Sequence, residues 1–522
     1  MSNYPSIFND VIGPVMRGPS SSHCAASLRI GRLCRDLMGG DIANILIEFD
    51  PNGSLATTHT DQGSDMGLFG GFLGWEADDE RLPDAEEHLA QAGISVTINI
   101  VDIGADHPNT YKITLSNPSE TRRLTAISTG GGMIEVIEID GAAVSMAGDY
   151  FETLVYCTSP DAVAELVKSR VAYEDVVVHT PFVEIKTREP LSDEIVGELL
   201  AMDGVASVTV LSPVLPVLAR KEMTVPFITC EEMLAFNEGK DLALWELAAA
   251  YESARGGITE VEVFEKMRVI VRIMDNAIKS GLQGTEYADR ILGSQSLQLR
   301  KQLEGRGLIG GDANNTIIMY VSATMEVKSS MGVIVAAPTA GSCGALPGAV
   351  FGVAHSLGAT EDDIVRAMLS AGIIGVFIAA HATFAAEVGG CMAETGSGGG
   401  MAAAAIVEMA GGTLAQSIGA SSLALQNSLG LICDPIGNRV EAPCLGRNVM
   451  AATNAISCAN MALAGYDHLI PLDEVIDTMK EVGDRIHHTL RCTNLGGLST
   501  TRTAKRIEAD LNVSSKAFFK NC

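Results

Sequence analysis

The sequence has few basic residues. Its 36 lysines and arginines stand against 64 aspartates and glutamates, which gives a formal net charge of −28. No stretch of the chain concentrates positive charge, so it lacks the basic surface with which proteins bind nucleic acid or anionic membranes. We therefore expect neither nucleic acid nor a membrane as a partner.

Signals for export are also missing. The first 18 residues lack a basic segment followed by an apolar one, which a secretion signal would require. The 11 cysteines are an odd number in a long chain, so we expect no disulfide framework. Residues 367–386 carry no charge and are long enough to span a bilayer, but they include His381 and many small residues. We interpret them as a buried central helix and expect a cytoplasmic protein.

Three regions differ in residue pattern. Residues 1–150 mix short strand-like runs with helices near 24–38 and 66–73, which predicts an α+β domain. Residues 151–220 show strand, helix, strand, strand, helix and strand patterns, which are typical of a ferredoxin-like (ACT-like) fold. Residues 225–510 have long helical periodicities, which predict an all-α catalytic domain. The expected fold class is therefore multidomain, with sheets first and helices after.

Three cysteines in the last third lie in Gly- and Pro-rich sequence. Cys391 is in GGCMAETGSGGG, and Cys433 and Cys444 are in LICDPIGNRVEAPC. Their separations of 42 and 11 residues match neither a structural zinc knuckle nor a ferredoxin run. The pattern leaves two interpretations open: metal ligands from separate loops, or buried structural cysteines. Cys522 ends an expected C-terminal tail, 511–522, which in extended form would be long enough to enter a cleft.

A resemblance to a known family favours the first of these interpretations. Seven stretches carry it: IGPVMRGPSSSH (12–23), GSDMGLFGGFLG (63–74), HPNT (107–110), STGGGMIEV (128–136), MGVIVAAPTAGSCGALPG (331–348), GGCMAETGSGGGMAAAA (389–405) and GLICDPIGNRVEAPCLGRN (430–448). With these motifs in this order over nearly its whole length, the chain resembles the iron–sulfur-dependent L-serine dehydratases (L-serine ammonia-lyases). It looks like a β-type half followed by an α-type half in one polypeptide.

The resemblance implies a [4Fe–4S] cluster held by Cys391, Cys433 and Cys444, with one iron lacking a thiolate from the folded body. It also implies that this iron is the Lewis acid that activates the substrate hydroxyl. A base removes the α-proton, and the aminoacrylate that results gives a 2-keto acid and ammonia. We expect Cys522 to be a displaceable fourth ligand, and Cys343 to line the cleft instead. The expected partners are an amino acid substrate and a second copy of the chain, as a homodimer.

The segment GPSSSH places three hydroxyls and a histidine just before an amphipathic helix. Such groups at a helix N-terminus bind a carboxylate, although a simple N-cap uses the same residue types. The resemblance favours the first interpretation. The predicted substrate-binding residues are Ser20, Ser21, Ser22, His23, Asp65, Thr339, Gly341 and Ser342.

Histidine is the expected base near neutral pH, and here the chain departs from its relatives. Where the family has a His-(Gly/His)-Thr-Asp motif, residues 62–65 of this chain read Gln-Gly-Ser-Asp, so Gln62 stands in place of the histidine. The nearest histidine is His59. Either His59 has taken over the role, or Gln62 keeps the binding part and another base acts. His381 stands where relatives commonly carry Asn, and is either a pocket residue or a satisfied core histidine. The predicted catalytic residues are His59, Gln62, His23 and His381.

These departures leave the substrate open between L-serine and another β-substituted amino acid, such as threonine, cysteine or a bulkier β-hydroxy amino acid. Two other functions also stay open: a pyridoxal phosphate lyase using GSGGG at 396–400, and a non-catalytic amino-acid or redox sensor. That glycine stretch is otherwise expected to allow close helix packing. The ACT-like segment lacks, at 159–162, the glycine that usually admits an amino acid. A spacing or dimerisation role without a ligand is therefore an alternative for that domain.

Overall fold

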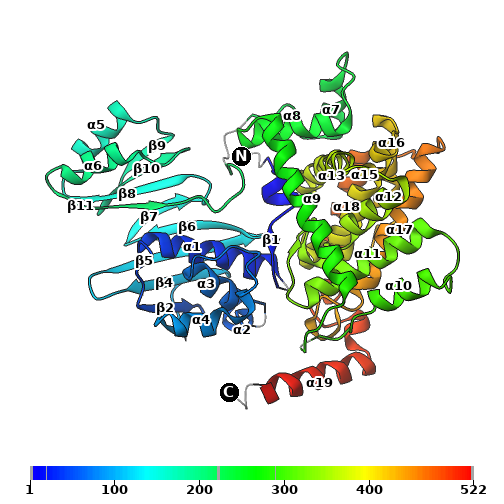
Figure 1. The fold of residues 1–522 in the computed structure, drawn as a ribbon, viewed down its shortest axis with the longest axis horizontal. Helices are drawn as coiled ribbons and strands as arrows, with labels where there is room; N and C mark the ends of the chain where they lie inside the picture. The colour runs from blue at the N-terminus through cyan, green and yellow to red at the C-terminus, as the bar shows by residue number, and fades with distance from the viewer. Residues whose placement is uncertain (1–3, 19, 61, 220–223, 289, 519–522) are drawn as a thin grey trace. The chain divides into compact units, whose positions relative to one another are not determined.

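The protein divides into two compact units (Figure 1). The computed structural model describes residues 4–18, 20–60, 62–219, 224–288 and 290–518. One unit is Ser20–Ala219 and contains the two larger sheets, and the other is Met1–Pro19 with Arg220–Cys522 and is mainly helical. This confirms a multidomain chain with sheets in the N-terminal part and helices in the C-terminal part. The predicted boundaries at residues 150 and 220 stay predictions.

The larger sheet has the strand order β3-β2-β4-β5-β6-β7. β2 and β3 are parallel, and the other neighbours are antiparallel. Alternate residues of the strands are buried and form one apolar core with the helices. This sheet confirms the short strand-like runs that the sequence predicted within residues 1–150. The strands are β2 (Asn44–Phe49), β3 (Ser95–Ile100), β4 (Thr110–Ser116), β5 (Thr121–Gly130), β6 (Met133–Ile139) and β7 (Ala142–Met146).

The helices of this sheet domain include the two that the sequence predicted. They are α1 (Ala26–Leu37), α2 (Leu55–Thr58), α3 (Ser64–Phe72) and α4 (Ala85–Gln91), and the π-helical turn η2 (Ser21–Ala25) precedes α1. α1 and α3 approach closely because glycines face each other. A Cβ on Gly71 would lie 2.4 Å from the Leu28 carbonyl oxygen, and one on Gly31 would lie 2.5 Å from that of Leu68. The contact therefore excludes any larger residue at these positions.

The smaller sheet has the order β11-β8-β10-β9, with every neighbouring pair antiparallel. Its elements follow the chain as β8 (Phe151–Cys157), α5 (Pro160–Arg170), β9 (Asp175–Val178), β10 (Phe182–Thr187), α6 (Asp193–Ala201) and β11 (Val205–Leu211). Val155 and Ile185 from the sheet pack with Val163 and Leu199 from the helices. The predicted βαββαβ series is confirmed, and its assignment to the ACT type stays a prediction.

The helical unit contains one long apolar helix, α13. Its residues from Ala367 to Ile378 are buried. By length and composition it is the one described helix that could cross a membrane, and 72% of its most apolar window is buried inside the protein. This burial supports the interpretation of a central core helix. The helices are α7 (Cys230–Asn237), α8 (Leu244–Gly256), α9 (Glu260–Gln283), α10 (Ser296–Glu304), α11 (Asp312–Ser329), α12 (Ala345–Leu357), α13 (Glu361–His381), α14 (Ala386–Cys391), α15 (Ser397–Met409), α16 (Leu414–Gln426), α17 (Cys444–Leu463), α18 (Leu472–Arg485) and α19 (Arg502–Phe518).

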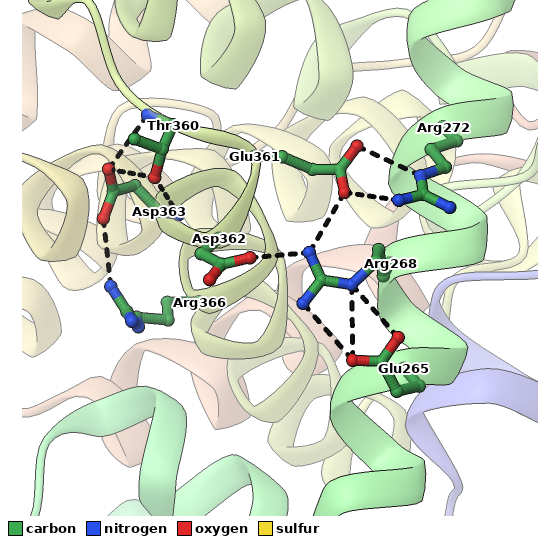
Figure 2. Close-up of polar contacts among 8 residues, drawn as sticks. All are labelled: Glu265, Arg268, Arg272, Thr360, Glu361, Asp362, Asp363 and Arg366. Atoms are coloured by element: carbon green, nitrogen blue, oxygen red, sulfur yellow. Dashed lines mark hydrogen bonds and ion pairs between the residues drawn. The ribbon is translucent and has the colours of Figure 1, made fainter.

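Ion pairs join the start of α13 to α9 (Figure 2). Arg268 contacts Asp362 at 2.6 Å and Glu361 at 3.0 Å, and Arg272 contacts Glu361 at 2.9 Å. Thr360 caps α13 by accepting from the Asp363 amide. Exposed ion pairs of this kind each contribute little to the free energy of unfolding. We therefore infer that they serve to align α9 with α13.

The first residues of the chain belong to the helical unit, although the sequence placed them with the α+β domain. The Ser6 hydroxyl and the Ile7 amide donate to the buried Glu252 carboxylate at 2.5 and 2.7 Å. β1 (Val15–Met16) pairs with β12 (Ile334–Val335). Apolar side chains between them, such as Val11, are buried against α13. This long-range packing has no signal in the local sequence pattern.

The expected extended tail from residue 511 is instead helical as far as Phe518, as the C-terminal part of α19. No glycine or proline interrupts residues 502–518, so nothing local ends the helix there. A helix advances about 1.5 Å per residue, less than half the rise of an extended chain. The reach inferred for Cys522 is therefore shorter than expected, and Cys522 itself lies outside the described residues.

Candidate functional site

The three cysteines singled out by the sequence lie in the helical unit. Cys391 ends α14, Cys444 begins α17, and Cys433 lies between them in a loop. The sulfur atoms of Cys391 and Cys433 and a carboxylate oxygen of Glu394 lie within 4.8 Å of one another. Burial raises the pKa of the Cys444 thiol. The charges of Cys391 and Glu394, which lie close to it, raise that pKa further. We call these four residues the thiol group.

A glycine allows the loops of the thiol group to meet. Gly390 has a φ of +68°, which a residue with a β-carbon rarely adopts. A Cβ there would lie 2.6 Å from the carbonyl oxygen of Leu431. That oxygen accepts from the Met392 amide at 3.0 Å, so the helix bearing Cys391 is tied to the loop bearing Cys433. The close approach of these two backbones therefore requires the glycine at position 390 in the GGC sequence.

The environment favours a thiolate at Cys391. A hydrogen bond from the Cys433 thiol lowers the pKa of Cys391, burial opposes this, and the Arg447 guanidinium lowers it further. Arg447 Nη1 lies 3.3 Å from the Cys391 sulfur, while its Nη2 donates to Asp434 at 2.5 Å. Hydrogen bonds with the Cys391 and Cys492 thiols raise the pKa of Cys433. Arg447 therefore contacts a candidate ligand.

Glu394 is a member of the thiol group that the sequence analysis missed. It accepts from the Thr339 hydroxyl at 2.8 Å, and burial raises the pKa of its carboxyl, with the charge of Cys391 adding to this. A Cβ on Gly341 would lie 3.1 Å from the Glu394 carboxylate. Glu394 follows Cys391 by three residues on helical backbone, and residues at that spacing share one face of a helix. This spacing could have predicted that Glu394 lies beside Cys391.

Asn448 connects the predicted substrate segment to the thiol group. Its side-chain amide donates to the carbonyls of Gly341 and Cys444, both at 2.9 Å. Its oxygen accepts from the amide of Ala345 at 2.9 Å. The structure therefore places Thr339 and Gly341 beside the thiol group. The Ser342 hydroxyl donates instead to the Ala337 carbonyl at 3.3 Å.

A second polar group lies in the unit Ser20–Ala219. His23 Nδ1 is 3.0 Å from the Ser20 hydroxyl, and its Nε2 is 3.2 Å from the Thr58 hydroxyl. Burial lowers the pKa of His23 to about 4, so its imidazole is neutral near pH 7. Ser21 begins η2 and is half-buried. The side chain of Ser22 lies outside the described part of the chain.

His59 and Asp65 are hydrogen-bonded to each other close to that group. His59 Nδ1 lies 2.8 Å from both Asp65 carboxylate oxygens, and the Thr60 hydroxyl donates to Asp65 at 2.8 Å. A carboxylate at Nδ1 favours the tautomer in which Nε2 accepts a proton. Gln62 lies between them in a turn and is half-buried. The structure thus brings His59 to the predicted Asp65. We call Ser20, His23, Thr58, His59 and Asp65 the histidine group.

The other sequence predictions fall elsewhere. His381 is the last residue of α13 and is exposed, with Nε2 3.1 Å from the Ile228 carbonyl oxygen; the alternative of a core histidine is wrong, because the helix ends there. Cys343 is buried against the Met325 sulfur at 3.8 Å. At Gly400, a Cβ would lie 2.8 Å from the Leu425 side chain, which supports the packing interpretation of GSGGG. Catalytic and binding roles for all these residues stay predictions.

Comparison with known proteins assigns the family. The family described as "Serine dehydratase alpha chain" matches residues 239–499. The chain is 38% identical over 285 residues to the "L-serine dehydratase, alpha chain" of Peptoniphilus asaccharolyticus, covering 54% of this chain and 97% of that one. It is 41% identical over 152 residues to the "Probable L-serine dehydratase, beta chain" of Bacillus subtilis, covering 29% of this chain and 68% of that one.

One relative extends over almost the whole chain. The "L-serine dehydratase" of Streptomyces coelicolor is 27% identical over 495 residues, which cover 92% of this chain and 96% of that one. The thiol group lies within the region that the alpha-chain family matches. The chain belongs to the iron–sulfur L-serine dehydratase family.

Proposed function

We propose that this protein is a dehydratase and deaminase of L-serine or a related β-hydroxy amino acid, and that it depends on a [4Fe–4S] cluster. The products are a 2-keto acid, which is pyruvate when the substrate is serine, and ammonia. The relatives named L-serine dehydratase support the substrate class. The observation that carries the proposal is the convergence of Cys391, Cys433 and Glu394 within 4.8 Å.

The donor set fits an iron–sulfur cluster. Thiolates hold such clusters, and hydrogen bonds and nearby charge at the sulfurs stabilise them. Cys391, Cys433 and Cys444 are all buried, and Arg447 supplies positive charge at one sulfur. When bound, the cluster supplies a Lewis acid for the departing hydroxyl. We assign the three cysteines as its ligands.

Residues around the thiol group orient Glu394. The Thr339 hydroxyl donates to one carboxylate oxygen, and Gly341 packs so close to that oxygen that a Cβ would lie 3.1 Å from it. Asn448 fixes the Gly341 and Cys444 backbones relative to each other. We propose that this arrangement admits the small polar part of an amino acid and excludes bulkier groups next to Glu394.

We propose His59 as the base that removes the α-proton. Its Nδ1 is occupied by Asp65 at 2.8 Å, so Nε2 is the nitrogen that accepts the proton, and the carboxylate stabilises the imidazolium that forms. His23 is neutral near pH 7 because it is buried, and with Ser20 it offers hydrogen bonds to a substrate carboxylate. Gln62 and His381 keep their predicted roles as alternatives for substrate contact.

The test is anaerobic reconstitution of the full chain with iron and sulfide, followed by assays of ammonia and keto-acid release. L-serine, L-threonine, L-cysteine and a bulkier β-hydroxy amino acid are compared. We expect cluster absorbance and ammonia release with L-serine or one of its analogues. Full activity from protein that carries zinc or no metal would overturn the proposal, and ligand binding without ammonia release would indicate a sensor.

We also propose that the enzyme is a cytoplasmic homodimer. Light scattering of the purified full chain tests the assembly, and a mass of one or four chains would contradict it. The role of residues 151–220 as an ACT-like module is tested separately by measuring whether free amino acids bind a variant that lacks the cluster.

A further inference from the structure

Residues 4–18, which we call the N-terminal arm, carry apolar side chains that are buried in the helical unit. Ile7, Phe8, Val11 and Ile12 are each at most 2% exposed. None of them belongs to the thiol group or to the histidine group. The first residues of a domain are ordinarily held loosely unless a specific interaction ties them down. The burial of the arm therefore indicates a dedicated seat.

Two glycines of α13 form one part of this seat. Gly372 and Gly375 lie about one helical turn apart. A Cβ on Gly372 would lie 2.7 Å from Cγ2 of Ile7, and a Cβ on Gly375 would overlap Cγ1 of Val11. Ile7 and Val11 are the two ends of the short helical turn η1 (Ile7–Val11). The glycines are thus notches that receive two side chains of the arm, and the close packing leaves no room for a methyl group.

Helix α8 holds the polar start of the arm. The Glu252 carboxylate accepts from the Ser6 hydroxyl and from the Ile7 amide at 2.5 and 2.7 Å. The Tyr251 hydroxyl donates to the Pro5 carbonyl at 2.8 Å. Both Glu252 and Tyr251 are fully buried. A buried carboxylate that loses its donors is costly, so Glu252 favours the state in which the arm is seated.

The other end of the arm is bonded to the segment that leads to the thiol group. The Gly13 amide donates to the Ala336 carbonyl at 2.9 Å, and the Ala336 amide donates to the Pro14 carbonyl at 3.1 Å. These bonds continue the pairing of β1 with β12. Thr339, whose hydroxyl donates to Glu394, follows Ala336 by three residues. The arm is therefore fixed to the backbone that supports a member of the thiol group.

The arm also leads directly into the histidine group. Ser20 follows Met16 by four residues, and an extended chain spans at most about 3.6 Å per residue. By chain length alone, Ser20 stays within about 14 Å of Met16. The Ser20 hydroxyl in turn lies 3.0 Å from His23 Nδ1. An arm that leaves its seat therefore releases the chain that enters the histidine group.

We propose that the N-terminal arm positions the histidine group for a substrate at the thiol group, and that Gly372, Gly375 and Glu252 are positioning residues that act through the arm. This inference rests on the proposed function, in which His59 removes the α-proton. A displaced arm leaves the thiol group and the base each intact but misaligned with each other. Because catalysis is sensitive to misplacement of about 1 Å, the defect appears in turnover while iron is retained.

The test compares full-length wild type, Gly375→Ala, Val11→Ala and the double variant, each reconstituted anaerobically. Alanine is a better helix former than glycine, so the single change does not weaken α13 itself. We expect kcat with L-serine to fall roughly 10- to 100-fold in Gly375→Ala at wild-type iron content. The double variant should recover most of this loss, because removal of the valine methyl groups makes room for the new Cβ. Hydrogen exchange of the amides of residues 7–12 reports the seating directly, and it should be faster in Gly375→Ala and slow again in the double variant.

Glu252→Gln tests the seat without touching a glycine, and it should also accelerate exchange and lower kcat. Gly197→Ala is the matched control, because a Cβ there, on α6, would meet no described atom within 4 Å; it should behave like wild type. Faster exchange with unchanged kcat would overturn the inference and leave the arm a purely structural role. Loss of iron together with kcat, or unchanged exchange in both Gly375→Ala and Glu252→Gln, would overturn it as well. If wild type releases no ammonia, the proposed function fails, whereas the exchange data still decide whether these residues seat the arm.

Discussion

The thiol group and the histidine group are built in different ways. The thiol group draws residues from Cys391 to Cys444, joined by a glycine approach and by hydrogen bonds between loops. The histidine group draws on residues 20–65, and its histidines contact residues from two short helical segments. The first is held together by close backbone approach between loops, and the second by side-chain hydrogen bonds, one of which joins His23 to Thr58 across 35 residues. Changes in the first should therefore affect metal retention, and changes in the second should affect chemistry alone.

The largest effect is expected for Cys433→Ser. Its thiol is hydrogen-bonded to Cys391, so the variant removes a ligand and disturbs its neighbour. Because removal of even an outer partner weakens metal sites about 10- to 100-fold, we expect iron content below roughly a tenth of wild type and no ammonia release. Iron analysis and absorbance after reconstitution measure this. Cys458→Ser, the same change at a cysteine outside the group, should retain its iron; full iron content in Cys433→Ser would contradict the ligand assignment.

His59→Gln should separate chemistry from metal binding. General base catalysis contributes about 100- to 10,000-fold, so we expect kcat to fall at least about 100-fold while iron content stays at the wild-type level. Asp65→Asn should fall less, because it misorients the imidazole without removing it. His88→Gln is the control, since His88 contacts Trp75 edge-to-face in the same unit and should leave kcat unchanged. Iron loss in His59→Gln would remove the contrast between the two groups.

The difference between local patterns and contacts between distant residues explains which features could be predicted from the sequence. The βαββαβ series and the helices α1 and α3 follow from local periodicity, and the cysteine motifs pointed to Cys391 and Cys433. Glu394 lay inside a quoted motif and was overlooked. Cys492 lies beside Cys433 only through a β-bridge between Cys433 and Arg491, 58 residues along the chain, so the local sequence held no signal for it. The packing of Ser6 and Ile7 on Glu252 is likewise a contact across about 250 residues, which local patterns do not contain.

A pH dependence should be specific to the histidine group. Burial lowers the pKa of His23 to about 4, against 6.5 in an unfolded chain. Between these values the unfolded state binds more protons, so the free energy of unfolding of this unit rises with pH from 4 to 6.5. The contribution is at most about 3.5 kcal/mol, since one pKa unit corresponds to about 1.4 kcal/mol.

Hydrogen exchange of the α1 amides at pH 4.5 and 7 measures this local stability. The difference between the two pH values should shrink in His23→Gln, which cannot titrate, and should persist in His107→Gln. An equal pH dependence in wild type and His23→Gln would mean that the histidine is not the buried neutral group that its contacts with Ser20 and Thr58 indicate.

The smallest effect is expected at Arg447, where charge and geometry can be separated. Arg447 bridges the Cys391 sulfur and the Asp434 carboxylate, and Asp434 also accepts from the Leu498 amide at 2.7 Å. Arg447→Gln removes the charge, and we expect cluster absorbance to be lost in air about 10-fold faster. Arg447→Lys keeps the charge but lacks the two-pronged geometry, so an intermediate rate is expected. If the lysine and glutamine variants bleach equally fast, the bridge to Asp434 matters more than the charge, and the thiol group depends on how its loops are held together.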